Sequence, residues 1–548
     1  MMRAIVVASL LSGLIGCSAD MSSSEPPVLE VTSPTRGTTM EGDQVTVTGT
    51  VQDDHKGVRV TVNGTTVTPS ADGSFTATVP ARAGIEIIET HAIDSDGNDV
   101  RDVRAVLAGH LEATDGTIAS PVGARVSAAA LTTVGNLIGS TVEKVDFTAA
   151  AQAMNPVYNN TGCLGAKIDI TTISIANIDV GMVPTTGAIT TAVAIDDVTV
   201  KMHANFKVAC IGGSTNITVR TTKARINGAL GLAVTGGKLT SSLPNATVAL
   251  DGFTVDIGGV PGAIESLLKG EARKAAEKAL TNLVKDKVPT FANTALEGLV
   301  AKPYTAGILG HDTRVMVTPK ELVLSSEGLY VAVDTKLAVA GGEGGMFVSN
   351  PAPMSASLMT STSGLGVAIA NDAVNQLFSG LWAAGAMEQT LPIESVGVVA
   401  SLLDDDAKTV GIELMLPPTV SSAGSALTLS VGDMIVTVKD ASGVEIQKLA
   451  LSLSTTLAAS PTQTGAVTLA VGTPTLYAQV LAQTDAVDRP LTSEQVEGII
   501  TGVWGVVGGQ ADSALANLPM PTISGVTLGA PSVEGRDGFV FAEIPLSM

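Results

Sequence analysis

The sequence has few aromatic residues and few charged residues, 3% and 15% of its 548 residues. Cores must therefore be built from aliphatic side chains, and the abundant Val, Thr, Ala, Ser and Gly suit short strands that turn often. Cations are scarce, because 31 Lys and Arg stand against 52 Asp and Glu, a net charge of −21. This balance argues against nucleic acid as a partner, since binding it requires cations that release counterions.

Recognisable catalytic and metal-binding motifs are also lacking. None of the five histidines falls in an H-E-x-x-H or paired-ligand spacing; they are His55, His91, His110, His203 and His311. There is no G-x-S-x-G elbow and no phosphate-binding loop. We therefore expect no enzyme activity, no catalytic residue, no metal and no cofactor.

Long apolar runs are absent beyond the N-terminus, so the mature chain is not expected to cross a membrane. The first residues have the pattern of a secretory signal, with Arg3 before an apolar stretch, 4–14. The segment Leu14-Ile15-Gly16-Cys17 resembles the lipobox of bacterial lipoproteins. That resemblance implies cleavage after residue 16, acyl chains on Cys17 and stable anchoring. The alternative is an ordinary signal peptide with a chance cysteine.

The resemblance to lipoproteins also bears on location. By the sorting rules of that class, Ser18 favours the outer membrane, with the periplasmic and cell-surface faces both open. Cys163 and Cys210 remain after Cys17 is used. An exported compartment permits a disulfide between them, which would stabilise by about 4 kcal/mol in the loop-entropy account. The alternative is two buried free thiols.

At this length the chain should form two to four domains. Residues 17–27 are a polar tether, 28–108 predict a β-sandwich, and 109–126 predict a linker. In the sandwich, valines alternate before the hairpin turn Asn63-Gly64. The "V-N-G" hairpin and the closing "AIDSDGN" resemble immunoglobulin-like spacer modules of bacterial surface proteins. This resemblance implies a fold and no specific function.

Beyond the linker, residues 127–302 and 303–548 share one predicted order of elements. Each begins with a helix or strand, continues as a long β-meander and includes a long amphipathic helix after it. Ser127 is predicted to cap a helix, and further helices are predicted at 262–288, ended or kinked by Pro289, at 372–385, capped by Asn371 or Asp372, and at 493–508. A capping box is predicted for the last helix, formed by Thr492 and Gln495.

The segment 363–385, SGLGVAIANDAVNQLFSGLWAAG, and the closing LPMPTISGV at 518–526 with Gly538-Phe539-Val540 resemble the bactericidal/permeability-increasing protein family. Pro351-Ala352-Pro353 resembles the family's Pro-rich stretch. The resemblance covers roughly 127–548. It implies a mainly β protein with long helices (α+β), in which two pseudo-symmetric barrels of sheet wrapped round a helix share a central sheet. It also implies apolar grooves that hold lipid acyl chains.

The helix stripes supply the candidate groove residues, although each could equally belong to a packed core. They are Leu131, Val134, Ile138, Ile264, Leu267, Leu268, Leu377, Phe378, Leu381, Trp382, Ile499, Ile500, Val503 and Trp504. The charge differs from that of family members that bind endotoxin, which have a strongly basic first barrel. Here residues 110–305 hold 16 basic and 15 acidic residues, and residues 306–548 hold 8 basic and 23 acidic residues. A neutral lipid or fatty acid is expected as the ligand. The main alternative is a surface adhesion or structural lipoprotein.

Overall fold

The computed structural model describes residues 25–547, apart from 54–56, 161, 261, 300–303, 351–353, 360–363, 462–466, 485–486, 488–489, 503–526 and 530–531. Cys17 and the predicted signal segment lie outside the described residues. The chain forms two compact units. The first contains the residues up to Thr35, Val45–Val79 and Ile88–Val103, and the second contains Arg36–Gln44, Pro80–Ile87 and the chain from Arg104 onward.

Strands of the N-terminal region form the first unit, and some of them belong partly or wholly to the second unit. The N-terminal strands are β1 (Val28–Ser33), β2 (Thr38–Glu41), β3 (Gln44–Gln52), β4 (Arg59–Val62), β5 (Thr65–Val67), β6 (Ser74–Pro80), β7 (Gly84–Ile93) and β8 (Asp99–Ala113). Alternate valines of β3 and β4 point into the core. Asn63 and Gly64 both have positive φ, 46° and 75°, which is the geometry of the predicted tight hairpin turn. The immunoglobulin-like assignment itself stays a prediction.

The segment expected as a linker, 109–126, is largely strand. Its first residues complete β8, and most of the rest belong to β9 (Thr117–Ser127). In the last part of β8, residues 106–109 pair with β2 and residues 110–113 pair with β21 (Met346–Ser349). Strand pairing satisfies its backbone groups, so the chain does not need a solvated connection here.

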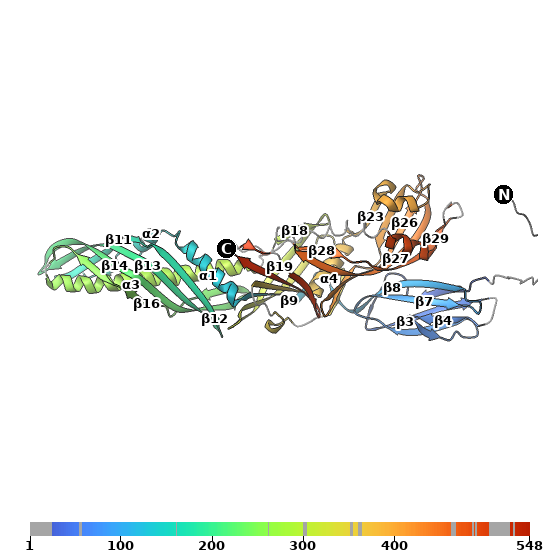
Figure 1. Ribbon diagram of the computed structural model, residues 1–548, viewed down its shortest axis with the longest axis horizontal. Helices are drawn as coiled ribbons and strands as arrows, with labels where there is room; N and C mark the ends of the chain where they lie inside the picture. Colours follow the sequence, from blue (N-terminus) through green and yellow to red (C-terminus); the bar gives the residue numbers. More distant parts are fainter. Residues whose placement is uncertain are drawn as a thin grey trace, which may run out of the picture. The chain divides into compact units, whose positions relative to one another are not determined.

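The part of the second unit that we call the first lobe consists of three helices and a curled sheet (Figure 1). Its helices are α1 (Ala128–Val142), α2 (Phe147–Gln152) and α3 (Gly262–Leu299). Its strands are β10 (Tyr158–Asn159), β11 (Leu164–Ser174), β12 (Asn177–Thr185), β13 (Ala188–Val208), β14 (Ile211–Thr235), β15 (Lys238–Ser242), β16 (Thr247–Asp251) and β17 (Thr254–Ile257).

In the first lobe, α3 lies along the concave side of the curled sheet (Figure 1). Alanines alternate with larger aliphatic residues on its buried face, so the strands can approach the helix closely. The helix continues through Pro289 to Leu299, so the predicted end at this proline is wrong. At the start of α1, Ser127 Oγ accepts a hydrogen bond from the Ala130 N–H at 3.1 Å, as predicted for a capping residue.

A central sheet contains β9 together with strands from the C-terminal part of the chain. These are β18 (Tyr304–Ile308), β19 (His311–Ser325), β20 (Gly328–Val339), β22 (Gly364–Ala370), β30 (Thr527–Leu528), β31 (Ser532–Arg536) and β32 (Phe539–Ser547). Strands β9 and β22 are antiparallel neighbours. Each leads directly into a helix, β9 into α1 and β22 into α4 (Asn371–Ala383). This repeat makes α1 and α4 structurally equivalent.

The remaining elements form the second lobe with α4. They are the 3₁₀ segments η1 (Ala356–Leu358) and η2 (Ile393–Leu402), the strands β23 (Gln389–Pro392), β24 (Thr409–Leu414), β25 (Thr419–Ala423), β26 (Ala426–Lys439), β27 (Glu445–Pro461), β28 (Val467–Val471) and β29 (Thr475–Gln483), and the helical residues 493–502. Strands β23–β29 make one sheet. The chain is thus mainly β with curled sheets, as the sequence predicts.

Candidate functional site

Helix α4 is held in the second lobe by its polar face. The buried residues of that face are Asn371, Asp372, Asn375, Gln376 and Ser379. Most bond backbone groups or side chains of neighbouring segments: Asn375 Nδ2 donates to the Val420 carbonyl at 3.2 Å, and Asn375 Oδ1 accepts the Val420 N–H at 2.7 Å. Gln376 Nε2 donates to the Gly116 carbonyl at 2.9 Å.

The apolar stripe of the same helix is only partly covered. Leu381 is buried, whereas Val374, Leu377, Phe378 and Trp382 are half-buried. The Trp382 indole is fixed, since its Nε1 donates to the Leu414 carbonyl at 2.6 Å. Partial exposure of several large apolar side chains in one row provides a surface that an acyl chain can cover.

The start of α4 differs from the prediction. The N-cap residue is Ala370, and Asn371 is already helical, so no side chain caps the helix. Both candidate capping residues instead bond neighbouring segments. Asn371 Nδ2 donates to Ser422 Oγ at 3.0 Å, and Asp372 accepts the Asn350 N–H at 2.9 Å and the Ser349 hydroxyl at 3.2 Å.

Burial raises the pKa of the Asp372 carboxyl, and the nearby charge of Glu112 raises it further. The hydrogen bonds from Asn350 and Ser349 oppose this rise because they favour the ionised form. The net direction is upward. A carboxyl group is thus buried at the first turn of the helix, on its polar face and away from the apolar stripe.

The last predicted helix begins as expected. The Thr492 N–H donates to Gln495 Oε1 at 2.8 Å and the Gln495 N–H donates to Thr492 Oγ1 at 3.2 Å, the reciprocal pair of a capping box. Val496 is buried, and Ile500 packs against the cluster that contains Leu449 and Leu451. Ile499 is half-buried. Val503 and Trp504, and the closing motif 518–526, lie outside the described residues.

The candidate residues of the first lobe lie in a packed core. Leu131, Val134, Ile138, Ile264 and Leu268 are each less than 10% exposed, and they share one cluster with strand residues of the curled sheet. Leu267 lies at its edge, partly buried. A ligand at these positions would have to displace packed side chains, so the structure brings the two sets of predicted groove residues into different environments.

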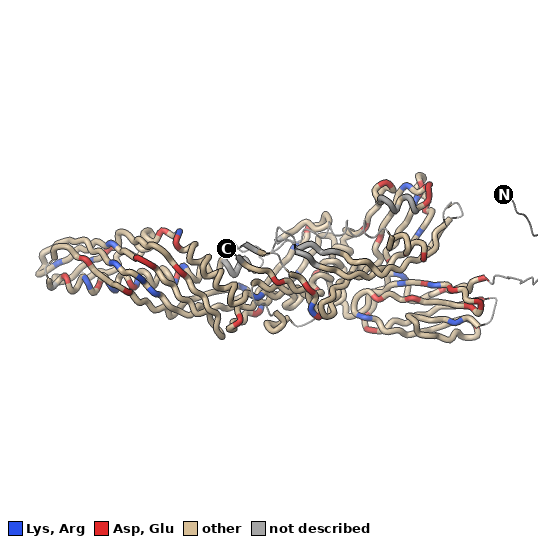
Figure 2. Tube along the Cα trace, in the orientation of Figure 1, with Lys and Arg blue, Asp and Glu red and all other residues tan. Residues whose placement is uncertain are grey.

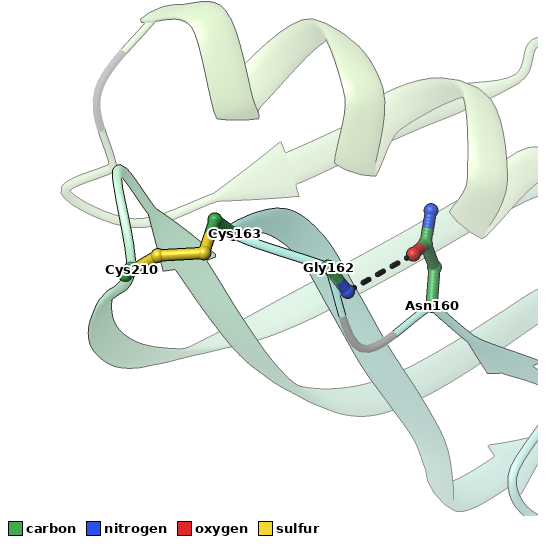
Figure 3. The surroundings of a disulfide bond; sticks show 4 residues. All are labelled: Asn160, Gly162, Cys163 and Cys210. Carbon is green, nitrogen blue, oxygen red and sulfur yellow. Dashed lines mark hydrogen bonds between the residues drawn. A yellow bond between two sulfur atoms is a disulfide. The ribbon is translucent and has the colours of Figure 1, made fainter.

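The predicted disulfide joins Cys163 and Cys210 (Figure 3). Ala209 and Cys210 form the two-residue turn between β13 and β14, and both have positive φ, 46° and 70°. This conformation is strained for residues other than glycine. The bridge ties the turn to the start of β11, next to the exposed Leu164. It therefore closes one end of the first lobe.

Other chemistry was sought among the described residues. Nowhere in that part of the chain do three or more His, Cys, Asp or Glu side chains gather as they would around a metal ion. His203 Nδ1 bonds Asn216 Oδ1 and His311 Nδ1 bonds the Ala340 carbonyl. Among the same residues, none of the helices is both long enough and apolar enough to span a membrane.

Sequence reasoning missed the buried polar face of α4. A signal was present, because the polar residues of this helix that the structure buries are three amides, one hydroxyl and one acid, with no lysine or arginine. Short amide side chains suit bonding to neighbouring backbone, whereas a solvated face usually carries long charged side chains. No comparable pattern in the sequence indicates that Arg36 contacts Asp433 in the second lobe.

The family described as "Glucodextranase, domain B" matches residues 27–110. No curated protein matches. The chain is similar to the "Crystal structure of lipopolysaccharide binding protein", with a TM-score of 0.44 and 12% identity over 78% of this chain and 99% of that one. It is also similar to the "Solution structure of latherin", with a TM-score of 0.19 and 14% identity over 29% of this chain and 80% of that one. Neither resemblance is close enough to bear on what this chain binds.

Proposed function

We propose that this protein binds lipid and that an acyl chain lies along the apolar stripe of α4, without chemical change to the lipid. The observation that carries the proposal is the orientation of α4. The helix buries Asn375 and Gln376 and leaves Leu377, Phe378 and Trp382 half-buried. Covering such a surface gains about 0.8 kcal/mol for each methylene removed from water.

Charge favours a lipid without a strongly anionic head group. Residues 306–548 hold 8 basic and 23 acidic residues, and Figure 2 shows acidic residues outnumbering basic ones in the second lobe. An excess of carboxylates repels phosphates. A neutral lipid or a single fatty acid therefore fits better than an endotoxin-like ligand.

The proposed setting is the outer membrane, with acyl groups on Cys17 as the anchor. The sequence Leu14-Ile15-Gly16-Cys17 supports this, and two or more acyl chains are enough for stable attachment. Growth with a clickable palmitate analogue should label the wild-type protein in the membrane fraction. The Cys17→Ala variant should be unlabelled; an equally labelled variant would contradict the anchor.

The test of lipid binding uses residues 18–548, which lack the proposed acylated cysteine, purified without detergent. Native mass spectrometry should show a bound lipid, and cis-parinaric acid, a fluorescent fatty acid, should bind and be displaced by palmitate. Leu377→Gln should weaken this binding several-fold. Leu137→Gln is the matched control, because Leu137 is a half-buried leucine on the equivalent helix α1. Equal effects of both variants, or no bound lipid, would overturn the proposal.

A surface adhesion or structural role is the second candidate. The observation that favours it is the separate β unit near the N-terminus, whose residues fall in the region matched by the family "Glucodextranase, domain B". Protease treatment of whole cells separates the two: an adhesin on the cell surface is cleaved, and a periplasmic lipid carrier is protected.

A further inference from the structure

A buried ion pair connects the loop at Arg36 to the second lobe, and both belong to the same compact unit. Arg36 Nη1 donates to Asp433 Oδ1 at 2.5 Å, and the Asp433 side chain has no exposed surface. Asp433 Oδ2 accepts the Ala105 N–H at 3.0 Å and the Gly37 N–H at 3.4 Å. A buried carboxylate with several donors is stable only while its cation remains.

Asp433 occupies an irregular point of the sheet. The register between β26 and β27 shifts between Val431 and Met434, as in a β-bulge. Asp433 itself has φ of +45°, a conformation that aspartate tolerates better than most side chains. The Asp433 N–H donates to Ser452 Oγ at 3.0 Å. The bulge is thus fixed by contacts on its backbone and on its carboxylate.

A short series of contacts leads from this bulge to α4. The Asp433 carbonyl accepts the Met415 N–H at 3.2 Å. Met415 follows Leu414, whose carbonyl accepts the Trp382 indole N–H. Gly37 packs on Met415 so closely that an added Cβ would lie 3.1 Å from the Met415 Cβ. The loop at 36–37 therefore reaches the segment 414–415, which orients Trp382, in two ways. Arg36 acts through Asp433, and Gly37 packs directly on Met415.

We propose that Arg36 is a positioning residue for the α4 site, acting through Asp433, Met415 and Leu414 on the Trp382 indole. This inference rests on the proposed lipid-binding function. The physical basis is a contiguous set of hydrogen bonds and packed atoms, and substitutions along such a set can change a binding constant by roughly two- to thirty-fold. In this proposal, the loop at Arg36 fixes the orientation of Trp382 in the apolar stripe of α4.

The test uses the same residues 18–548, labelled with 5-fluorotryptophan. The chain has two tryptophans, so ¹⁹F NMR gives two resonances, and the resonance missing from Trp382→Phe belongs to Trp382. Arg36→Met should shift this resonance and weaken cis-parinaric acid binding on the order of five-fold. Arg36→Lys should restore part of both. Arg82→Met is the control, because the Arg82 side chain is 93% exposed and pairs with Glu86, and this variant should change neither.

A second variant keeps the test valid if Arg36→Met fails to fold. Gly37→Ala leaves the ion pair in place but presses a methyl group on Met415. Gly42→Ala is its control, since Gly42 also has positive φ but has no atom near the added Cβ. Only Gly37→Ala should move the Trp382 resonance and weaken the probe. If the wild type fails to bind the probe, the proposed function is wrong; if it binds and both loop variants match their controls, the positioning role is wrong.

Discussion

The equivalent helices α1 and α4 are buried by opposite faces. Each follows a strand of the central sheet, β9 or β22. Helix α1 buries Leu131, Val134 and Ile138 against β12 and the rest of the first lobe. Helix α4 buries amides and an aspartate and leaves most of its apolar stripe half-buried. The same order of elements thus supports a packed core in one lobe and a half-buried apolar stripe in the other.

The disulfide is expected to give the largest difference between the lobes, because the second lobe contains no cysteine. The double variant Cys163→Ser/Cys210→Ser should lose about 4 kcal/mol of unfolding free energy, since it frees a loop in the unfolded chain. Guanidinium unfolding followed by hydrogen exchange should place the loss in β11–β14. Ala209→Gly is a useful companion, because it should stabilise the turn by relieving a positive φ. A loss confined to the second lobe would contradict this account.

Leucine truncation tests most directly whether the two lobes are packed differently. Leu268→Ala removes a side chain with no exposed surface, so it should cost about 3 kcal/mol of unfolding free energy. Leu377→Ala removes a half-buried one and should cost about 1 kcal/mol. Fatty-acid affinity should respond in the opposite order, with the larger loss for Leu377→Ala. If both truncations lower the unfolding free energy equally and change fatty-acid affinity equally, the α4 stripe is packed as tightly as the core of the first lobe.

The sequence predicts most elements of these lobes but not this difference. Periodicity finds the helices because apolar residues recur every three or four positions, and the local capping signals of Ser127 and Thr492 are read correctly. Which face of a helix is buried depends on the backbone that surrounds it. The carbonyl of Val420 and that of Gly116 reach α4 from distant segments, and no local pattern of α4 encodes their positions.

Pro289 and Asp433 show the same limit. Proline lowers helix propensity locally, yet packing of the long helix on the curled sheet carries α3 past it. The residues around Asp433 have the alternating pattern of a strand, which does not indicate a buried acid. The presence of an acid is explained by its contact with Arg36, which is distant in the sequence. The disulfide was predictable because two cysteines remain for one pairing.

Glycines test how closely α1 lies on its strand. A Cβ at Gly135 would lie 2.5 Å from the Val180 carbonyl oxygen, and one at Gly139 would lie 2.8 Å from that of Ile178. Gly135→Ala should therefore cost about 2 kcal/mol, despite the better helix propensity of alanine. Gly270→Ala on α3 is the control, because nothing lies near its added Cβ, and it should be neutral or stabilising. Thermal unfolding distinguishes the two; equal midpoints would show that α1 can move away from β12.

The smallest expected effect is the pH dependence contributed by Asp372. Its pKa is raised in the folded protein, so between the unfolded and folded pKa values the folded state binds more protons than the unfolded state. This group therefore lowers stability as pH rises through that window and leaves a constant penalty above it. Asp372→Asn keeps an acceptor for the Asn350 N–H, removes the buried charge and should slightly raise the unfolding midpoint at neutral pH. The difference between variant and wild type should shrink as pH falls below the raised pKa, measured by urea unfolding at several pH values. A variant that is less stable at neutral pH, or a difference independent of pH, would show that the carboxylate is held by its hydrogen bonds more strongly than burial opposes it.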